Sequence, residues 1–503
     1  MNHKMVLIPK IITDAASIVA FQIFVDKFEY KLSLYFYLGM NYISSSLGSI
    51  SGMTFERVAA LYEDKTRTSK MLFDRAKKVF AGGVNHNIRF FRPYPFFSER
   101  ARGRYLIDVD GNKYTDYWMG HWSLILGHSP RVIVRALSRQ LDSGALYGTA
   151  NVVSLCLGEL IQKLMPNAER VRFSSTGSEA TMYAVRLARA WTRKRKVAKA
   201  IGGWHGFNTT LMHTVNYPFH EGEGSGLLAE ERKSIESLPF NDLDASIRIL
   251  EGSLDDLACI ILEPILAGAG CIPPEPGYLK GLQEFAQRRD IIFILDEIVT
   301  GFRLSLGGAA LRYNLDPDLF TLGKIVGGGM PIGAVCGKKE LLEQADFTVQ
   351  DRKHSRCAIG GGTYSCNPLT MVAGLATIKY LEKNKNKLYQ RINDLGDRTR
   401  RGLTKIFTEG KIDVQVTGEG SLFLTHFLND KVRRVKDALD AATSDQQQLY
   451  MYHMALMALH RIFFLPYKMG AISFAHSNND ITRLLQATQS IVDSGILSST
   501  GWR

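Results

Sequence analysis

The chain has 503 residues, 45% of them hydrophobic and 22% charged, a composition typical of a soluble globular protein with more than one domain. Its six cysteines lack CxxC spacing, and no run predicts a transmembrane helix, so we expect a cytoplasmic protein without a metal site or a membrane partner. A net charge of +13 would suit an anionic macromolecule, but the densest basic run, residues 189–199 with four consecutive basic residues at 193–196, ends a predicted helix, where cations are favoured anyway. We therefore expect no nucleic-acid partner.

The N-terminal part of the chain contains an extension and the beginning of a small domain. Residues 1–52 are rich in aromatic and β-branched residues, and a regular helical pattern begins only at Met53. We assign no function to this extension, for which a signal-like segment is the alternative interpretation. Residues 53–125 are expected to start the small domain, because the turn residues 110–112 lie between two short strand patterns and predict a β-hairpin.

Residues 126–385 are expected to form a large α/β domain, and residues 386–503 to complete the small α+β domain from the other end of the chain. In the central part, short apolar strands alternate with amphipathic helices, which is typical of a parallel sheet covered on both faces. The predicted strands are 171–173, 197–203, 257–263 and 291–297, and the predicted helices are 179–191 and 277–289.

Two residues near the end of this alternation carry the most specific chemistry. Lys324 lies in a glycine-rich run, and Asp296 closes the apolar strand 291–295. A lysine amine can hold an aldehyde cofactor as a Schiff base, while a carboxylate holds the ring nitrogen of that cofactor protonated. The alternative partner of Asp296 is an arginine such as Arg303, because a lone buried carboxylate is costly. The run is not a nucleotide P-loop, since Ile325 follows the lysine.

Two further segments are expected at the carboxyl edge of the sheet, where open α/β folds bind ligands. Residues 175–180 lie between a strand and a helix, so their amides and hydroxyls would face a phosphate at the helix N-terminus. Residues 204–206 follow another strand and present Trp204, which can stack on a planar ring. A plain helix cap and a core tryptophan are the alternatives.

Taken together, these segments resemble the class III, fold type I aminotransferases that use pyridoxal phosphate, and among them the glutamate-1-semialdehyde aminomutases. The resemblance runs from about residue 73 to about residue 492 and implies a mostly parallel seven-stranded sheet between helices. The motifs that carry it are 81–85 with Arg89, 108–112, 126–128, 175–180, 296–297 with 300–303, 323–324, and 362–363 with 367–368.

The resemblance implies a role for each cofactor-binding residue. Lys324 and Asp296 would be catalytic, holding the aldehyde and the ring nitrogen of pyridoxal phosphate. Gly177 and Ser178 would bind the phosphate. Thr363 would reach the same phosphate from a second subunit, which implies a homodimer with shared active sites.

Other residues would enclose the ring and bind the substrate. Trp204 would cover one face of the ring and Ile298 the other. Arg89 would receive the substrate carboxylate, a geometry suited to its bidentate guanidinium. His86 stands beside it where the family carries a serine, so it is also expected to contact the substrate.

This chain departs from the aminomutase pattern in the substrate half of the site. The asparagine that the family carries near the cofactor is missing from the run 263–270. A family glutamate aligns with Gly470, and the tryptophan of a family turn is replaced by His121 or by a shifted Trp122.

The expected function is therefore an aminotransferase or aminomutase that acts on a carboxylate-bearing amino acid, with a 2-oxo acid as the second substrate of a transaminase. An amino-acid racemase on the same scaffold is one alternative. A non-catalytic relative that binds pyridoxal phosphate and uses its basic surface for interactions is the other.

Overall fold

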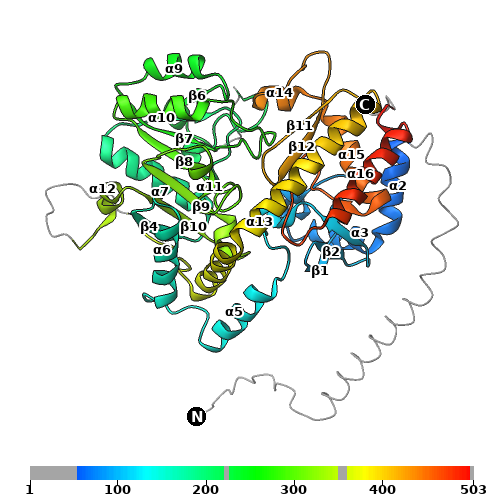
Figure 1. Ribbon diagram of the computed structural model, residues 1–503, viewed down its shortest axis with the longest axis horizontal. Helices are drawn as coiled ribbons and strands as arrows, with labels where there is room; N and C mark the ends of the chain where they lie inside the picture. Colours follow the sequence, from blue (N-terminus) through cyan, green and yellow to red (C-terminus); the bar gives the residue numbers. More distant parts are fainter. Residues whose placement is uncertain (1–53, 220–225, 349–358, 499–503) are drawn as a thin grey trace, which may run out of the picture. The chain divides into compact units, whose positions relative to one another are not determined.

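The computed structural model describes residues 54–219, 226–348 and 359–498, and the extension expected at residues 1–52 lies outside them. A seven-stranded sheet forms the centre of its larger part, with helices around it (Figure 1). In sheet order the strands are β4 (Arg170–Ser174), β10 (Gly333–Gly337), β9 (Leu319–Gly323), β8 (Ile292–Asp296), β7 (Leu257–Leu262), β5 (Lys196–Ala200) and β6 (Ile235–Leu238).

All neighbouring strands of this sheet are parallel except those next to β10, which is antiparallel to both β4 and β9. Strands β7, β8, β9 and β10 are buried along their whole length. Burial on both faces explains why their sequences are continuous apolar runs rather than alternating ones. The sheet confirms the expected mostly parallel seven-stranded α/β architecture.

Helices cover the sheet and connect its strands. The apolar side of α7 (Gly177–Thr192), which includes Ala184 and Leu187, packs against sheet residues such as Ile261 and Ile294. The other helices of this part are α5 (Arg131–Asp142), α6 (Val152–Leu164), α8 (Ala229–Lys233), α9 (Leu243–Glu251), α10 (Tyr278–Arg288), α11 (Gly308–Arg312) and α12 (Lys339–Leu342).

A smaller part contains two further sheets. One has the order β1 (Ser98–Arg102), β2 (Tyr105–Asp108), β3 (Lys113–Asp116) and β13 (Ile462–Phe463), and the other β11 (Val414–Thr417), β12 (Leu422–Phe427) and β14 (Gly470–Ala471). Its helices are α2 (Phe55–Lys65), α3 (Arg67–Ala76), α4 (Met119–Trp122), α14 (Ala438–Thr443), α15 (Gln446–His460) and α16 (Asn478–Asp493). Because β13 pairs with β3, the two ends of the described chain share one sheet.

One long helix, α13 (Pro368–Glu409), packs on elements of both parts. It has 42 residues and contacts α5 and α6 as well as α16 and β11. The expected domain boundary after residue 385 falls inside this continuous helix. The domain boundaries expected at residues 125 and 385 stay predictions.

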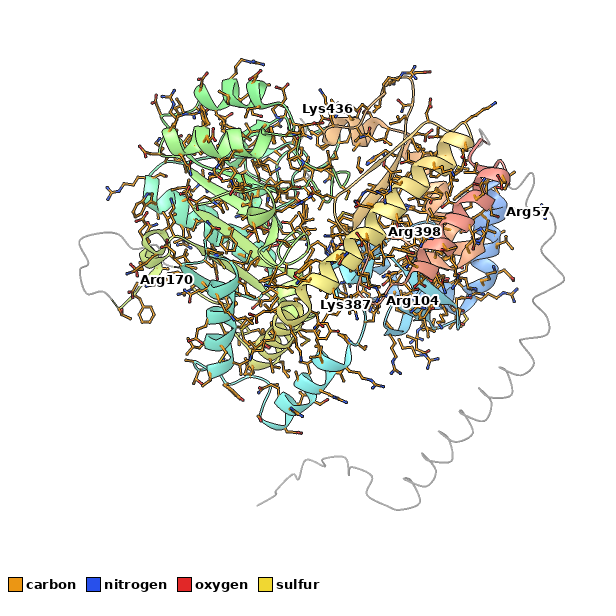
Figure 2. All side chains as sticks on the ribbon, in the orientation of Figure 1. Arg57, Arg104, Arg170, Lys387, Arg398 and Lys436 are labelled. Carbon is orange, nitrogen blue, oxygen red and sulfur yellow. The ribbon has the colours of Figure 1, made fainter. Side chains whose placement is uncertain are left out.

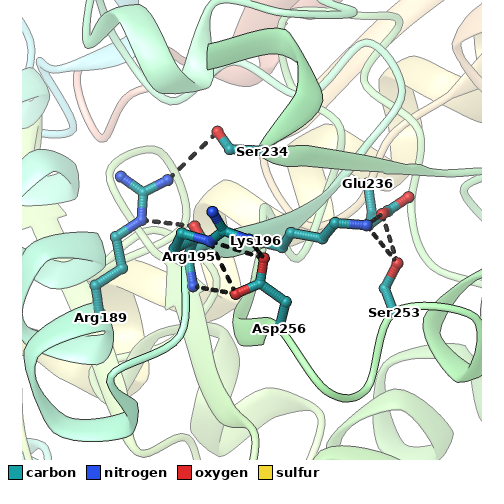
Figure 3. Close-up of polar contacts among 7 residues, drawn as sticks. All are labelled: Arg189, Arg195, Lys196, Ser234, Glu236, Ser253 and Asp256. Atoms are coloured by element: carbon teal, nitrogen blue, oxygen red, sulfur yellow. Dashed lines mark hydrogen bonds and ion pairs between the residues drawn. The ribbon is translucent and has the colours of Figure 1, made fainter. Parts of the chain in front are cut away.

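The basic run that ends α7 is compensated by nearby acidic residues (Figure 3). Arg195 forms an ion pair with Asp256 at 2.9 Å, and Lys196 forms one with Glu236 at 2.6 Å. The first ion pair connects the start of β5 with the loop before β7, and the second connects β5 with β6. The run thus has a structural role at this sheet edge.

Other basic side chains are distributed over several elements (Figure 2). Arg104 pairs with Asp480 at 2.7 Å, and Arg170 pairs with Glu343 at 3.2 Å. Figure 2 also labels Lys387 on α13. Within the described ranges, no helix is long and apolar enough to cross a bilayer.

Candidate active site

Asp296 and Lys324 lie at the same edge of the sheet because neighbouring strands place them there. Strand β8 ends at Asp296, which pairs in register with Thr321 of β9. Lys324 follows β9 directly and has a φ of +48°, so the chain turns sharply out of the sheet at this residue. The structure thus brings the two residues expected to be catalytic into one site.

The carboxylate of Asp296 is buried and accepts three hydrogen bonds. Its Oδ1 accepts from the Thr321 hydroxyl at 2.9 Å and from the Ile298 amide at 3.1 Å. Its Oδ2 lies 2.7 Å from Nδ1 of His205, which donates to it. Burial lowers the pKa of His205, so this histidine is a neutral donor.

The alternative partner of Asp296, Arg303, points elsewhere. Its fully buried guanidinium donates to the carbonyl oxygens of Trp122 and Ile472. Arg303 therefore fixes the turn that contains Trp122. The alternative in which an arginine pairs with Asp296 is not met, because His205 contacts the carboxylate instead.

Lys324 is half-buried near two carboxyl groups and an aromatic ring. Burial lowers the pKa of its amine, while Asp296 and Glu263 act in the opposite direction. Its Nζ lies 5.8 Å from the centroid of the Trp122 ring. Of the two residues considered for the family's tryptophan position, Trp122 thus contacts the lysine.

Glu263 is the second buried carboxyl group of the site. Its Oε1 accepts from the Trp204 amide at 2.8 Å, and its Oε2 accepts from the Ala267 amide at 3.3 Å. Burial, with a contribution from the negative charge of Asp296, raises its pKa to about 8. Glu263 therefore holds the backbone of Trp204 and is mostly protonated at neutral pH.

Ile298 lies against two glycines that leave room for nothing larger. A Cβ on Gly177 would lie 3.0 Å from Cδ1 of Ile298, and a Cβ on Gly323 would lie 2.9 Å from it. Trp204 is partly exposed, and its ring packs edge-on to Phe207 at 4.9 Å. Both residues expected to cover a ring are thus at the same strand ends as Asp296.

The N-terminus of α7 lies next to these residues. Thr176 and Glu179 form a capping box, in which the Thr176 side chain accepts from the Glu179 amide. Ser178 accepts a hydrogen bond from the Phe207 amide at 3.1 Å, which leaves its own hydroxyl hydrogen for another acceptor. The cap is formed by Thr176 and Glu179, so it leaves Gly177 and Ser178 available for the expected phosphate, whose binding stays a prediction.

Thr363 is exposed on the loop before α13. Its neighbour Gly362 lies near the N-terminus of α7, since a Cβ there would be 3.3 Å from Oε1 of Glu179. Its expected contribution across a subunit interface stays a prediction.

The residues expected to bind substrate lie among several basic groups. His86 and His121 have ring centroids 5.8 Å apart. Burial lowers the pKa of His121 to about 3, helped by the charges of Lys324, His86, Lys468 and Arg89. Arg89 itself is exposed. Arg89, His86 and Lys324 therefore all act on His121, and the expected substrate-binding roles of Arg89 and His86 stay predictions.

Gly470, which stands where the family carries a glutamate, has no space for a side chain. A Cβ there would lie 2.5 Å from the Phe464 ring. Sequence reasoning also did not identify Lys468 as part of the site. No sequence motif marks Lys468, because only the folding of the chain brings it close to the other residues of the site.

Glu263 and Thr321 were also missed as site residues, whereas His205 was expected at this sheet edge as part of residues 204–206 but without its contact to Asp296. Each belongs to or follows a strand of the central sheet, and each is polar within or beside an apolar run. A polar residue within or beside an apolar strand was therefore the signal that could have pointed to the site.

Comparison with known proteins agrees with this architecture. The chain matches the class III aminotransferase family over residues 90–459. It is 37% identical over 428 residues to a glutamate-1-semialdehyde 2,1-aminomutase of Methanosphaera stadtmanae, covering 84% of this chain and 98% of the relative. An omega-transaminase structure from Sphaerobacter thermophilus is 30% identical with a TM-score of 0.78, covering 85% of this chain and 97% of that one.

A more distant structure has the same fold. A glutamate-1-semialdehyde aminomutase from Pseudomonas aeruginosa, solved in complex with PMP, has a TM-score of 0.78 at 20% identity, covering 88% of this chain and 97% of that one. The resemblance drawn from the motifs is confirmed. The chain therefore belongs to the class III aminotransferases, a family of pyridoxal-phosphate-dependent enzymes of fold type I.

Proposed function

We propose that this protein transfers the amino group of a carboxylate-bearing amino acid, with Lys324 as the cofactor-holding and proton-transferring residue. The observation that carries this proposal is the arrangement of one half-buried amine and one buried carboxylate at the ends of neighbouring strands. Such a pair suits an aldehyde cofactor with a basic ring nitrogen.

The residues of the site fit pyridoxal phosphate. A carboxylate offers about four lone-pair positions, and three donors already occupy positions on Asp296, so one is left for a ring N–H. The free hydroxyl hydrogen of Ser178 and the start of α7 suit a phosphate. The glycines that contact Ile298 suit a flat ring.

Pyridoxal phosphate, when bound, supplies an aldehyde for the lysine and a ring that withdraws electrons from the substrate α-carbon. The residues of this chain supply the proton transfer and the positioning. Burial favours the neutral amine of Lys324, the form that attacks the aldehyde and later accepts a proton at Nζ. Asp296 keeps the ring nitrogen protonated, and His205 and Thr321 keep Asp296 oriented.

The remaining roles form part of the same proposal. Trp204 and Ile298 enclose the ring, Gly177 and Ser178 bind the phosphate, and Arg89 with His86 receives the substrate carboxylate. Thr363 joins the phosphate site from the partner of a homodimer. Its exposure and the exposed apolar residues of the neighbouring helices, such as Val134 and Leu155, support that assembly. We place the enzyme in the cytoplasm, which its free buried cysteines support.

The proposal predicts a cofactor-dependent colour. Purified protein incubated with pyridoxal phosphate should absorb in the visible, and Lys324→Ala should lose this band and lower turnover by at least roughly 10²–10⁴-fold. Lys379→Ala, which changes an exposed lysine of α13, is the control and should keep both. A wild-type protein that stays colourless would contradict the proposal.

The relatives include both mutases and transaminases, so the acceptor needs a separate test. The protein is incubated with single amino acids, with and without a 2-oxo acid. Turnover that depends on the acceptor identifies a transaminase, whereas an amino shift without any acceptor identifies an aminomutase. Inversion of the same carbon would identify a racemase.

A further inference from the structure

A cavity of about 280 Å³ is lined by none of the residues to which the chemistry described above assigns a role. The loop that follows Glu263, strand β12 and helices α14 and α15 line it. Its polar lining residues include Asn216, His426, Gln446 and Lys468. A site that binds a small molecule needs both such a space and polar groups that converge on it.

Gly268 is the part of the cavity lining that lies next to Trp204. It lines the cavity, and its nearest neighbour outside the loop is Trp204, whose Cβ would lie 3.8 Å from a Cβ on the glycine. Gly268 is also the position at which the resembled family carries its asparagine. A side chain at residue 268 would lie beside Trp204 at the cavity wall.

Lys468 lies where the cavity meets the substrate side of the active site. The next residue, Met469, accepts a hydrogen bond from Nε1 of Trp122 at 2.9 Å. The charge of Lys468 lowers the pKa of His121, as does that of Lys324, so these basic groups surround one space.

The ammonium group of Lys468 has no counter-ion in the described part of the chain. The residue is half-buried, and burial lowers the pKa of its amine. A partly buried amine without a counter-ion gains stability in its charged form when a ligand supplies the anion. An acidic group entering the cavity would therefore find a ready partner.

His426 adds a second, independent polar group. It is 1% exposed, and its Nε2 lies 2.9 Å from the Gly270 carbonyl oxygen, to which it donates. Its Nδ1 is therefore an acceptor, and this atom is buried without a hydrogen-bond partner. Burial lowers the pKa of His426 to about 4, so the ring is neutral at physiological pH. His426 lines the cavity, and its Nδ1 is a buried acceptor whose hydrogen-bonding capacity is unused within the described residues.

Building on the proposed function, we infer that this cavity binds the distal acidic group of the substrate, with Lys468 as its cation, so that the enzyme prefers a dicarboxylic amino acid. Arg89 then binds the carboxylate next to the reacting carbon, and the two cations recognise the two ends of one molecule.

The first test measures binding without chemistry. Glutarate and butyrate, which carry no amino group, are titrated calorimetrically into the cofactor-loaded protein. Wild type should bind glutarate at least about tenfold more tightly than butyrate, the size expected for one charge-assisted contact. Lys468→Met should abolish this preference, Lys468→Arg should keep most of it, and Lys379→Met should keep all of it.

The second test places a side chain at the cavity wall beside Trp204. Gly268→Asn introduces a side chain without backbone strain, since φ at this residue is not in the left-handed region and no atom crowds its Cβ. It should raise KM for glutamate and 2-aminoadipate at least about tenfold, leave KM for norvaline unchanged, and leave the visible cofactor band intact.

The outcomes separate the two proposals. A normal cofactor band, together with equal binding of glutarate and butyrate or an unaltered preference in Lys468→Met, overturns this inference alone. Should Lys468→Met fail to fold, Lys468→Arg and Gly268→Asn still decide, because a Gly268→Asn protein with unchanged KM for glutamate also overturns it. Failure of the wild-type protein to acquire the band overturns the proposed function and this inference with it.

Discussion

At the residue scale, the site depends on how buried polar groups satisfy one another. Asp296 is held by Thr321, Ile298 and His205, all at hydrogen-bond distance. A buried carboxylate that is well oriented by donors needs no reorganisation when a cationic ring nitrogen binds. Asp296 therefore acts through its negative charge, which stabilises the ring nitrogen in its protonated form, rather than through its shape.

Replacing Asp296 by asparagine removes the negative charge of the side chain while keeping its shape. Asp296→Asn should keep the visible cofactor band, because Lys324 is intact, but lower kcat by roughly 10²–10³-fold, the usual effect of losing one oriented electrostatic contact. Steady-state kinetics and an absorbance spectrum measure the two effects. Asp255→Asn, on the surface, should change neither. A variant with near-normal kcat would exclude a role for the charge.

At the element scale, α13 supports the turn that carries Lys324. Gly374 of this helix lies against the backbone two residues beyond the lysine, since a Cβ there would be only 2.3 Å from the Val326 carbonyl oxygen. The close packing of helix and turn needs glycine at this point. An exposed helix glycine would not have this constraint.

Gly374→Ala should therefore destabilise the protein by about 3 kcal/mol and weaken the cofactor band. Chemical denaturation and absorbance measure the two effects. Gly158→Ala is the matched control within α6, because its Cβ would meet only the Phe173 ring, at 3.9 Å. This control should be stabilised by about 0.5–1 kcal/mol. Equal behaviour of the two variants would refute the proposed support.

At the scale of the whole molecule, buried histidines link stability to pH. His453 is 2% exposed and stacks on Phe464 with ring centroids 4.9 Å apart. Burial lowers its pKa to about 3 from the ordinary value of 6.5. The unfolded chain binds a proton below pH 6.5 while the folded chain does not, so stability falls as the pH falls from 6.5 towards 3.

His453→Phe should remove part of this acid sensitivity. Between pH 8 and pH 5 the wild type should lose about 2 kcal/mol more stability than the variant, as the linkage relation requires for this shift. Urea denaturation at the two pH values measures it. Tyr452→Phe, which removes a hydrogen bond to Thr488, should lose a similar amount of stability at both pH values. A variant as acid-sensitive as the wild type would contradict the assignment.

Much of the architecture could be predicted from local sequence patterns. Strands β7 and β8 and helices α7 and α10 lie within one or two residues of their expected positions, because apolar periodicity and glycine or polar boundaries are local signals. The antiparallel strand β10 between β4 and β9 was not deduced from the pattern itself, since strand order depends on long-range pairing.

The sequence by itself determined the fold class and the family, because local strand and helix patterns and several short motifs carry them, and it predicted the pair Asp296 and Lys324 from the segments around each residue. Only the tertiary structure decided that His205 rather than Arg303 contacts Asp296, that Trp122 faces Lys324, and that Lys468 and His426 share a cavity with Gly268. These partners come from separate segments. Packing and burial select among many compatible side chains, and no local pattern encodes that choice.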